Sequence, residues 1–494
     1  MNLIKKKLAV LAAAAAALSS CGSQVGKVDH STESSQMPTQ AETSAPDESS
    51  QEAAPTEAKG EESSPEKSSG KASVRGKMYD CDGRLLMYSQ DGRRYVSEEF
   101  AYPFANVLTE MSAGLDGTFN DLLTEKNPTP VDGSDDVGQG IQVTFDAQVQ
   151  KAVYDYMQSM NIVGSAVVMR TDGSLMAEVS YPSYDPNTYT DTKYDEELAW
   201  GECGNKAFQN FEPGSCFKIM SEVISDKHGV TSQTDPGIWE FGDFPITNWD
   251  YERNASSYPM ERSLYSAFVN SSNIYFAKSF DQIGAEDVLS DLKTIFHFGG
   301  DEEDDIHCDF GSLENNIEIY CDDDLRRSAF GQSYVLTCPI FLAALGREAV
   351  FGDMVKPFVL ENVVDSNDCS SVIDPGTAHS EVIASIPAEY RQGLLDGMTG
   401  VASGLSVSVP AGHTLYAKTG TAETWIGDVL YITGCVKNDS DSGTTVYTDY
   451  SDYGQTGSYV IVMQIQNPAA HGFSFASESA RVYDGIVNAV VNNV

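Results

Sequence analysis

The chain has 494 residues, enough for two or three domains and a large hydrophobic core. Its 31 lysines and arginines face 73 aspartates and glutamates, so the formal net charge at pH 7 is -42. This charge excludes nucleic acid as a partner, because binding a phosphate backbone requires a basic protein surface.

The first 20 residues predict an export signal. Lysines precede an apolar run of about a dozen residues, a pattern typical of a secretory signal and too short for a membrane span. The sequence Leu18-Ser19-Ser20-Cys21 resembles a bacterial lipobox, which implies cleavage before Cys21 and lipid on its thiol and new N-terminus. We therefore expect a lipoprotein signal peptide at 1–20 and a protein held at the membrane outside the cytoplasm. An ordinary signal peptide with an incidental cysteine is the alternative.

Residues 21–74 predict an acidic, disordered tether. The segment is rich in Ser, Glu and Pro and has almost no large apolar residue, so it cannot bury enough surface to fold. As a flexible coil it would hold the folded part roughly 40 Å from the membrane.

The stretch EPGSCFKIM, residues 212–220, contains the first candidate catalytic pair. Pro213-Gly214 ends a loop, and the apolar spacing that follows predicts a largely buried helix. Ser215 would begin this helix, and Lys218 would lie one turn later on the same face. A lysine in a dry pocket can take the proton of a serine hydroxyl. The spacing alone is weak evidence, since an N-cap serine followed by a structural lysine would look the same. It also recurs at Ser64 and Lys67, Ser68 and Lys71, and Ser290 and Lys293.

Two further motifs follow in chain order. Ser271-Ser272-Asn273 falls at a predicted turn between two helical segments. Lys418-Thr419-Gly420 falls between stretches whose alternating apolar residues predict strands.

Together these residues could cleave an amide through a serine ester. Ser215 would be the nucleophile and Lys218 its base, and Ser271 could relay a proton to the leaving amine. Asn273 could bind a substrate amide. Lys418 could hold a carboxylate or lower the pKa of Lys218.

The strand around Thr419 and Thr421 could pair with an extended peptide. Gly420 would leave room beside the nucleophile, since a side chain there is expected to point into the cleft. Backbone N–H groups of Ser215 and Thr421 are the candidates for an oxyanion hole. The predicted chemistry uses no metal and no cofactor.

The three motifs match, in order, the S-x-x-K, S-x-N and K-T-G motifs of penicillin-binding proteins and serine β-lactamases. The stretches GSAVVMRTDGSLMAEVSYPSYDPN and FGQSYVLTCPIFLAAL resemble the transpeptidase domain, and RGKMYDCDGRLLM resembles the N-terminal signature of the monofunctional class B enzymes. The resemblance covers roughly residues 75 to 490. It implies a mixed α/β (α+β) fold with a five-stranded antiparallel sheet flanked by helices. A small pedestal is expected at 75–140 and the transpeptidase domain at 141–494.

The resemblance implies a serine D,D-transpeptidase that cross-links peptidoglycan. Stem peptides ending in D-Ala-D-Ala and β-lactams would both acylate Ser215, and other cell-wall synthesis proteins are possible partners. The alternatives are a D,D-carboxypeptidase or β-lactamase-like hydrolase and a non-catalytic module that senses β-lactams or binds the wall. Ser-Ser-Asn stands where class A β-lactamases have Ser-Asp-Asn, which disfavours a β-lactamase.

Several residues depart from the family pattern or remain open. Cys216 replaces the usual threonine and could tune acylation or expose a thiol. The acidic run at 301–305 predicts a solvated loop, with a calcium site as the alternative. Cys308 and Cys321 are the nearest cysteines for a disulfide, although scattered buried thiols are favoured.

Overall fold

The computed structural model describes residues 70–109, 114–134, 136–188, 204–240, 244–376, 381–443 and 457–494. The predicted signal peptide, Cys21 and the tether up to residue 69 lie outside the described residues. Residues 70–74, which composition had assigned to the tether, already pair with the folded part, since Lys71 bridges Glu125 and Val74 bridges Val137.

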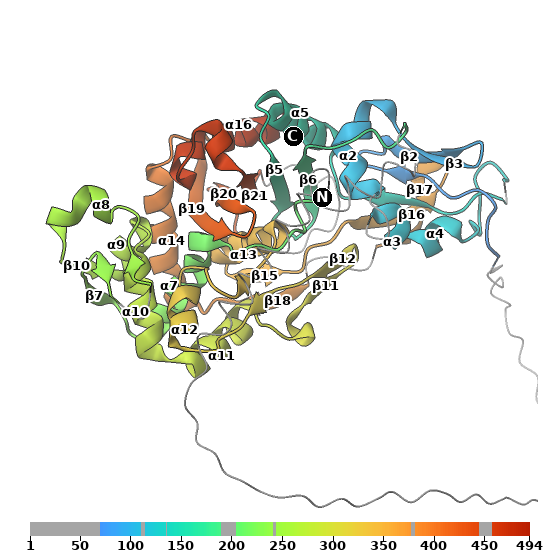
Figure 1. Ribbon diagram of the computed structural model, residues 1–494. Coiled ribbons are helices and arrows are strands. Elements are labelled where there is room, and N and C mark those ends of the chain that lie inside the picture. The colour runs from blue at the N-terminus through green and yellow to red at the C-terminus, as the bar shows by residue number, and fades with distance from the viewer. Residues whose placement is uncertain are drawn as a thin grey trace, which may run out of the picture. The chain divides into compact units, whose positions relative to one another are not determined.

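A five-stranded antiparallel sheet with the order β19-β20-β21-β5-β6 forms the centre of the fold (Figure 1). Strand β21 has the sequence YVIVMQIQ and is buried along its whole length, because helices cover both of its faces. The predicted mixed α/β fold is therefore confirmed. The strands are β5 (Gly164–Arg170), β6 (Leu175–Tyr181), β19 (His413–Thr424), β20 (Gly427–Asn438) and β21 (Tyr459–Gln466).

Helices cover the two faces of this sheet with separate apolar clusters. Helices α5 (Ala147–Ser159) and α16 (Ala480–Val491) pack on one face, and α16 places Tyr483 and Ile486 in the same cluster as Ile461 of β21. Helix α13 (Pro339–Phe351) lies on the other face. It is buried all round, as its PIFLAALGREAVF sequence predicts for a central helix.

A helical lobe lies beside the edge strand β19. Helix α14 runs next to β19 and also packs against α7 and α9 (Figure 1). Short hairpins join these helices. The helices are α7 (Lys218–Lys227), α8 (Tyr251–Asn254), α9 (Leu264–Val269), α10 (Asn273–Ile283), α11 (Ala285–Phe296), α12 (Asp322–Ser328) and α14 (Ala388–Ser403). The short strands are β7 (Ser232–Asp235), β8 (Ile238–Trp239), β9 (Ile246–Thr247), β10 (Met260–Ser263), β11 (Ile306–Cys308), β12 (Gly311–Leu313), β13 (Asn316–Ile317), β14 (Val335–Leu336), β15 (Asp353–Val355) and β18 (Val382–Ser385).

The N-terminal segment forms part of a second, six-stranded sheet with the order β17-β16-β4-β1-β2-β3. Two of its strands, β16 and β17, come from residues 360–375, more than 200 positions along the chain from β4. The remaining elements of this region are β1 (Met78–Tyr79), β2 (Leu85–Gln90), β3 (Arg93–Val96), β4 (Gly140–Val143), α2 (Ala101–Leu108), α3 (Leu115–Thr118) and α4 (Asn120–Thr124), with β16 (Leu360–Asp365) and β17 (Asp368–Pro375) completing the sheet.

The seven cysteines among the described residues are all free, so Cys308 and Cys321 do not pair. The acidic run at 301–305 is exposed at its first three residues, but Asp304 is buried and forms an ion pair with Lys293 at 2.7 Å. The expectation of a fully solvated loop is wrong at that residue, because a lysine on α11 supplies its counter-charge.

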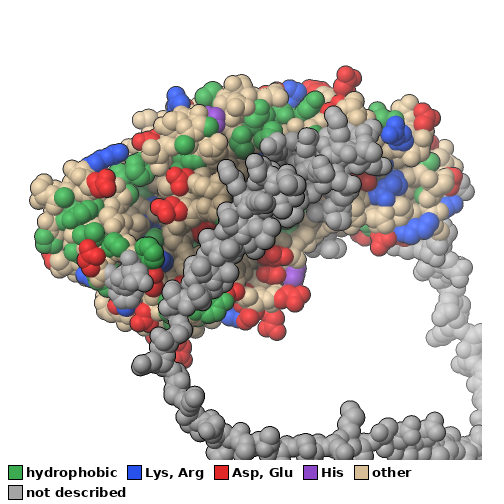
Figure 2. Space-filling model, in the orientation of Figure 1, with side chains coloured by type: hydrophobic (Ala, Val, Ile, Leu, Met, Phe, Trp, Pro, Cys, Tyr) green, Lys and Arg blue, Asp and Glu red, His purple; other side chains and the backbone are tan. Residues whose placement is uncertain are grey.

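Acidic side chains are spread over the face shown in Figure 2, whereas lysines and arginines gather mainly over the six-stranded sheet. None of the helices within the described ranges combines the length and apolar composition that crossing a membrane requires.

Candidate active site

Ser215 lies in a short 3-10 turn, Gly214–Phe217, that leads directly into α7 at Lys218. Gly214 has a φ of +53°, which a residue with a side chain rarely adopts. The tight turn brings Ser215 Oγ to 2.8 Å from Lys218 Nζ. The pair predicted from the sequence is therefore in direct contact.

Backbone packing fixes the position of this turn. A Cβ on Gly214 would lie 2.4 Å from the Thr421 carbonyl oxygen, and one on Gly331 would lie 2.2 Å from the Gly214 carbonyl oxygen. Gly214 N–H also donates to the Gly331 carbonyl at 3.0 Å. The turn that carries Ser215 is thus held between the edge strand and the loop that carries Gly331.

Gly420 has a different role from the one the sequence suggested. Its Cβ would lie 2.7 Å from the Pro213 carbonyl oxygen and 2.9 Å from Cys216 Sγ. A side chain at this position would clash with Pro213 and Cys216, and it would not point into the space expected for substrate. Glycine is needed because β19 and the nucleophile turn make backbone contact.

Lys218 is fully buried, and its amine has four polar neighbours. Besides Ser215 Oγ, Nζ lies 2.9 Å from the Ser271 carbonyl oxygen, 3.1 Å from Ser271 Oγ and 2.7 Å from Asn273 Oδ1. The carbonyl and amide oxygens can only accept, so they take two N–H bonds. In a neutral amine the remaining lone pair then faces the hydroxyl groups, as a base for Ser215 requires.

Burial lowers the pKa of Lys218 well below 10.5, and the charge of Lys418 lowers it further. Cys216 and Asp235 act in the opposite direction. Phenylalanine rings complete the surroundings, with Phe276 and Phe330 centred 6.0 and 5.9 Å from Nζ. Such an environment favours the uncharged amine near neutral pH.

Lys418 of β19 reaches the same group of atoms from the sheet. Its Nζ donates to Ser271 Oγ at 3.1 Å and to the Thr419 carbonyl at 2.9 Å, and its side chain is fully buried. Burial lowers the pKa of Lys418 to about 8. The Ser271 hydroxyl therefore lies between the two amines and is placed to pass a proton.

The turn that carries Ser271 is fixed at both ends. Ser271 has a φ of +54°, and Ser272 caps α10 by accepting from Tyr275 N–H at 3.1 Å. Asn273 is the first residue of α10, and its side-chain amide also donates to the Thr247 carbonyl at 3.1 Å. Its Oδ1 accepts from Lys218 Nζ at 2.7 Å, so the side chain of Asn273 links the β9 backbone to the Lys218 amine.

A buried polar network that the sequence did not reveal supports this turn. Asp235 accepts from Ser272 Oγ at 2.7 Å, from Arg262 Nε at 2.6 Å and from Asn248 Nδ2 at 2.8 Å. Asn248 Oδ1 in turn accepts from Asn273 N–H at 2.8 Å. No local motif marks these residues, because two separate hairpins bring them together.

The edge strand leaves room for a peptide. No strand in the described part of the chain pairs with the outer edge of β19, and Thr419 and Thr421 on it are half-buried. Thr421 Oγ1 accepts from Ala476 N–H at 3.2 Å. Such an edge can bind an extended chain through backbone hydrogen bonds.

The Cys216 thiol is buried and donates to the Lys418 carbonyl at a distance of 3.6 Å. The expectation that it could be exposed is therefore wrong, because Cys216 packs between the nucleophile turn and the sheet.

Within the described ranges, one group of three potential metal ligands has donor atoms close enough to share an ion: Cys81, Asp82 and Asp146. None of these belongs to the Ser215 site. Asp146 already caps α5 by accepting from two backbone N–H groups.

The model of the penicillin-binding protein transpeptidase domain matches residues 164–487, well over half of the chain. The chain belongs to this family. The match spans all three motifs and the whole five-stranded sheet of the transpeptidase domain.

Individual relatives are more distant. Penicillin-binding protein 3 of Bacillus subtilis (strain 168) is 27% identical over 359 residues, 68% of this chain and 49% of that protein. A peptidoglycan D,D-transpeptidase FtsI homolog of Mesostigma viride is 24% identical over 365 residues, 65% of this chain and 60% of that protein. The chain therefore spans half to three fifths of the length of these relatives.

Among solved structures, the transpeptidase fold resembles penicillin-binding protein A of M. tuberculosis in its imipenem acyl-enzyme complex. The TM-score is 0.67 at 19% identity, covering 85% of this chain and 99% of that one. This similarity confirms the fold.

Replacing Asp235 tests the buried network. Asp235→Asn should lower the free energy of unfolding by about 3–5 kcal/mol, because it leaves the Arg262 guanidinium buried without a counter-charge. Urea unfolding measures this change. The matched control is Glu261→Gln, an exposed carboxyl next to Arg262 in sequence, which should change stability by less than about 0.5 kcal/mol. Equal effects of the two substitutions would contradict the assigned role.

The two lysines predict a specific pH dependence of acylation. The rate should rise as Lys218 loses its proton and fall above about pH 8 as Lys418 does. In Lys418→Met the rising limb should move to higher pH, because the positive charge that lowers the pKa of Lys218 is gone. Second-order rates of acylation by a penicillin between pH 5 and 10 provide the measurement. Lys437→Met, on the neighbouring strand, should leave the profile in place, and an unmoved limb in Lys418→Met would rule out the electrostatic coupling.

Proposed function

We propose that the protein is a serine D,D-transpeptidase that cross-links peptidoglycan stem peptides and is acylated by β-lactams. The observation that carries the proposal is the contact of Ser215 Oγ with a buried lysine amine whose other neighbours are hydrogen-bond acceptors. The Mesostigma relative named a peptidoglycan D,D-transpeptidase and the acyl-enzyme of penicillin-binding protein A support the same chemistry.

Acylation begins when Ser215 Oγ attacks the carbonyl carbon of the D-Ala-D-Ala amide. Its proton passes to Lys218 Nζ, and the carbonyl oxygen becomes an oxyanion near the Ser215 and Thr421 backbone. The amide C–N bond then breaks as a proton reaches the leaving nitrogen through Ser271 Oγ. D-Alanine departs, and the donor peptide remains as an ester on Ser215.

Transfer to the second stem peptide reverses the proton movements. An acceptor amine attacks the ester carbonyl and gives up a proton, and Ser215 Oγ regains one as the ester bond breaks. Lys418, which lies beside Ser271, would attract the terminal carboxylate of the donor while that carboxylate is present. A β-lactam acylates in the same way, but its ring opens and no group leaves.

Labelling with a fluorescent penicillin tests the nucleophile and its base. The full chain should form a covalent adduct, whereas Ser215→Ala should form none and Lys218→Ala should lose at least about a hundredfold in rate. The chain supplies its own control, since Ser290 and Lys293 have the same spacing on α11. Ser290→Ala, which leaves the ion pair between Lys293 and Asp304 intact, should label normally.

Absence of label on the unaltered chain would remove the basis for this proposal and favour the non-catalytic alternative. The rate at which label is lost separates a transpeptidase, which keeps the adduct, from a β-lactamase-like hydrolase, which releases it.

We also propose that lipid on Cys21 anchors the protein at the outer face of the cytoplasmic membrane. The lipobox-like sequence before Cys21 supports this proposal. Cells fed an alkynyl fatty acid should incorporate it into the unaltered protein, and Cys21→Ser should abolish incorporation because the acceptor thiol is lost. Equal incorporation by both would show that Cys21 is not the site.

A further inference from the structure

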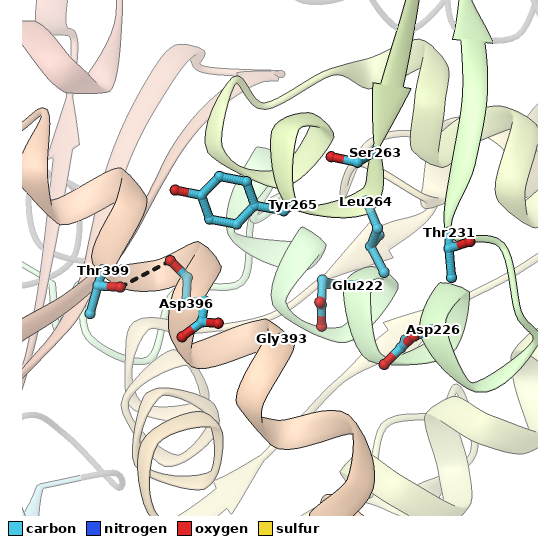
Figure 3. A pocket seen from close by; sticks show the side chains of 9 residues that line it. All are labelled: Glu222, Asp226, Thr231, Ser263, Leu264, Tyr265, Gly393, Asp396 and Thr399. Carbon is cyan, nitrogen blue, oxygen red and sulfur yellow. Dashed lines mark hydrogen bonds between the residues drawn. The ribbon is translucent and has the colours of Figure 1, made fainter.

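A hollow separate from the Ser215 site opens between helices α7, α9 and α14 (Figure 3). Its volume is about 610 Å³, in the range of small-molecule sites. Three carboxyl groups line it, and none of the lining residues is a lysine, arginine or histidine. The carboxyl groups belong to Glu222, Asp226 and Asp396.

Glu222 is the central group of this pocket. It lies on α7 one turn after Lys218 and is only 2% exposed. Its Oε2 atom has no hydrogen-bond partner in the described part of the chain. Figure 3 shows its carboxyl group amid the other lining side chains. A buried carboxyl without a partner is costly, so a ligand that donates hydrogen bonds would stabilise it.

The other carboxyl groups lie nearer the solvent. Asp226, one turn further along α7, is half-buried, and Asp396 on α14 is exposed and accepts from Gln392 Nε2 at 2.8 Å. Ser263, Tyr265 and Thr399 add hydroxyl groups to the lining (Figure 3). The pocket therefore has one carboxyl in its wall and two closer to its mouth.

The spacing of these carboxyls argues against a single metal ion. Among the described residues, only Cys81, Asp82 and Asp146 have three donor atoms within 4.8 Å of one another. The pocket's three carboxyls do not all lie within that distance of one another. Carboxyl groups spread through a hollow of this size suit an extended organic cation.

We propose that this pocket binds an aliphatic ammonium ligand, with the buried carboxyl of Glu222 accepting from the ammonium and Asp226 and Asp396 attracting further positive charge. The proposal does not depend on the function proposed above. The ligand would contact α7, α9 and α14, the helices that carry Lys218 or lead to Ser271 and Lys418.

The protonation of Glu222 gives the binding a pH dependence. Burial, aided by the charge of Asp226, raises the pKa of the Glu222 carboxyl to about 8. Among the other titratable groups, Tyr275 of α10 interacts with Glu222, and Tyr265 of α9 and Asp396 of α14 line the same pocket. An ammonium bound near neutral pH must displace the proton of Glu222, whereas an alkyl amine itself stays charged up to about pH 10. Affinity should therefore rise between about pH 6.5 and 8.5.

Calorimetric titration of the full chain with 1,5-diaminopentane tests the site. We expect saturable binding of one ligand per chain. Glu222→Gln should weaken binding at least about tenfold, and Asp226→Asn and Asp396→Asn several-fold, because each removes a charged acceptor. Glu302→Gln, an exposed carboxyl outside the pocket, is the matched control and should bind like the unaltered chain. Circular dichroism and urea unfolding of each variant report whether it is folded, independently of penicillin acylation.

The source of the ammonium is distinguished by a second titration with Nα-acetyl-lysine amide. Tighter binding of the diamine indicates a free polyamine-like ligand, and tighter binding of the lysine derivative indicates a peptide side chain. A third titration uses calcium chloride. Saturable binding of calcium in preference to both amines, equal diamine affinity in all pocket variants, or no saturable binding of either amine would overturn the proposal. The Asp226 and Asp396 variants decide the matter if Glu222→Gln does not fold.

Discussion

The active site depends on the burial of two lysine amines around a single serine hydroxyl. Lys218 Nζ and Lys418 Nζ each lie 3.1 Å from Ser271 Oγ, and both side chains are fully buried. Two positive charges this close in a dry site would repel strongly, so at least one amine is held neutral. The lowered pKa of Lys218 is what the proposed role of a base requires.

The fold satisfies this constraint by bringing three chain segments to one point. The helical lobe supplies Ser215 and Lys218, a capped turn supplies Ser271 and Asn273, and the edge of the sheet supplies Lys418. Backbone contacts at glycine positions hold the nucleophile turn against the sheet. Asp235 does not contact Lys218; it accepts a hydrogen bond from Ser272 and so supports the turn. Its negative charge raises the pKa of Lys218 and so acts against the effect of burial. The contact between Ser215 and Lys218 therefore depends on how closely these segments pack as well as on which residues they carry.

Features governed by local spacing were predictable from the sequence. Ser215 and Lys218 are three residues apart, and helical geometry alone brings them together; the helices around Ser271 and the strands around Lys418 followed from hydrophobic periodicity. The five-stranded antiparallel sheet was expected from the family resemblance, because periodicity carries no information on which strands pair, and the strand order came only from the structure.

Features made by contacts between distant segments were not predictable. Residues 360–375 complete the sheet of the N-terminal region, and no pattern in their sequence indicates that β16 pairs with β4. Asp235, Asn248 and Arg262 have ordinary sequence surroundings and become a network only after two hairpins fold. Gly420 was recognised as necessary, but the atoms it must avoid belong to Pro213 and Cys216, some 200 residues earlier.

The most direct test of this account is the titration of the Lys218 side chain itself. Magnetic resonance of lysine labelled with carbon-13 at Cε, assigned by comparison with Lys218→Met, reports the protonation of the amine. The account predicts that Lys218 titrates well below 10.5 in the free protein. Titration near 10.5 would mean that the buried amine remains charged at neutral pH, and Lys218 could not then be the base that activates Ser215.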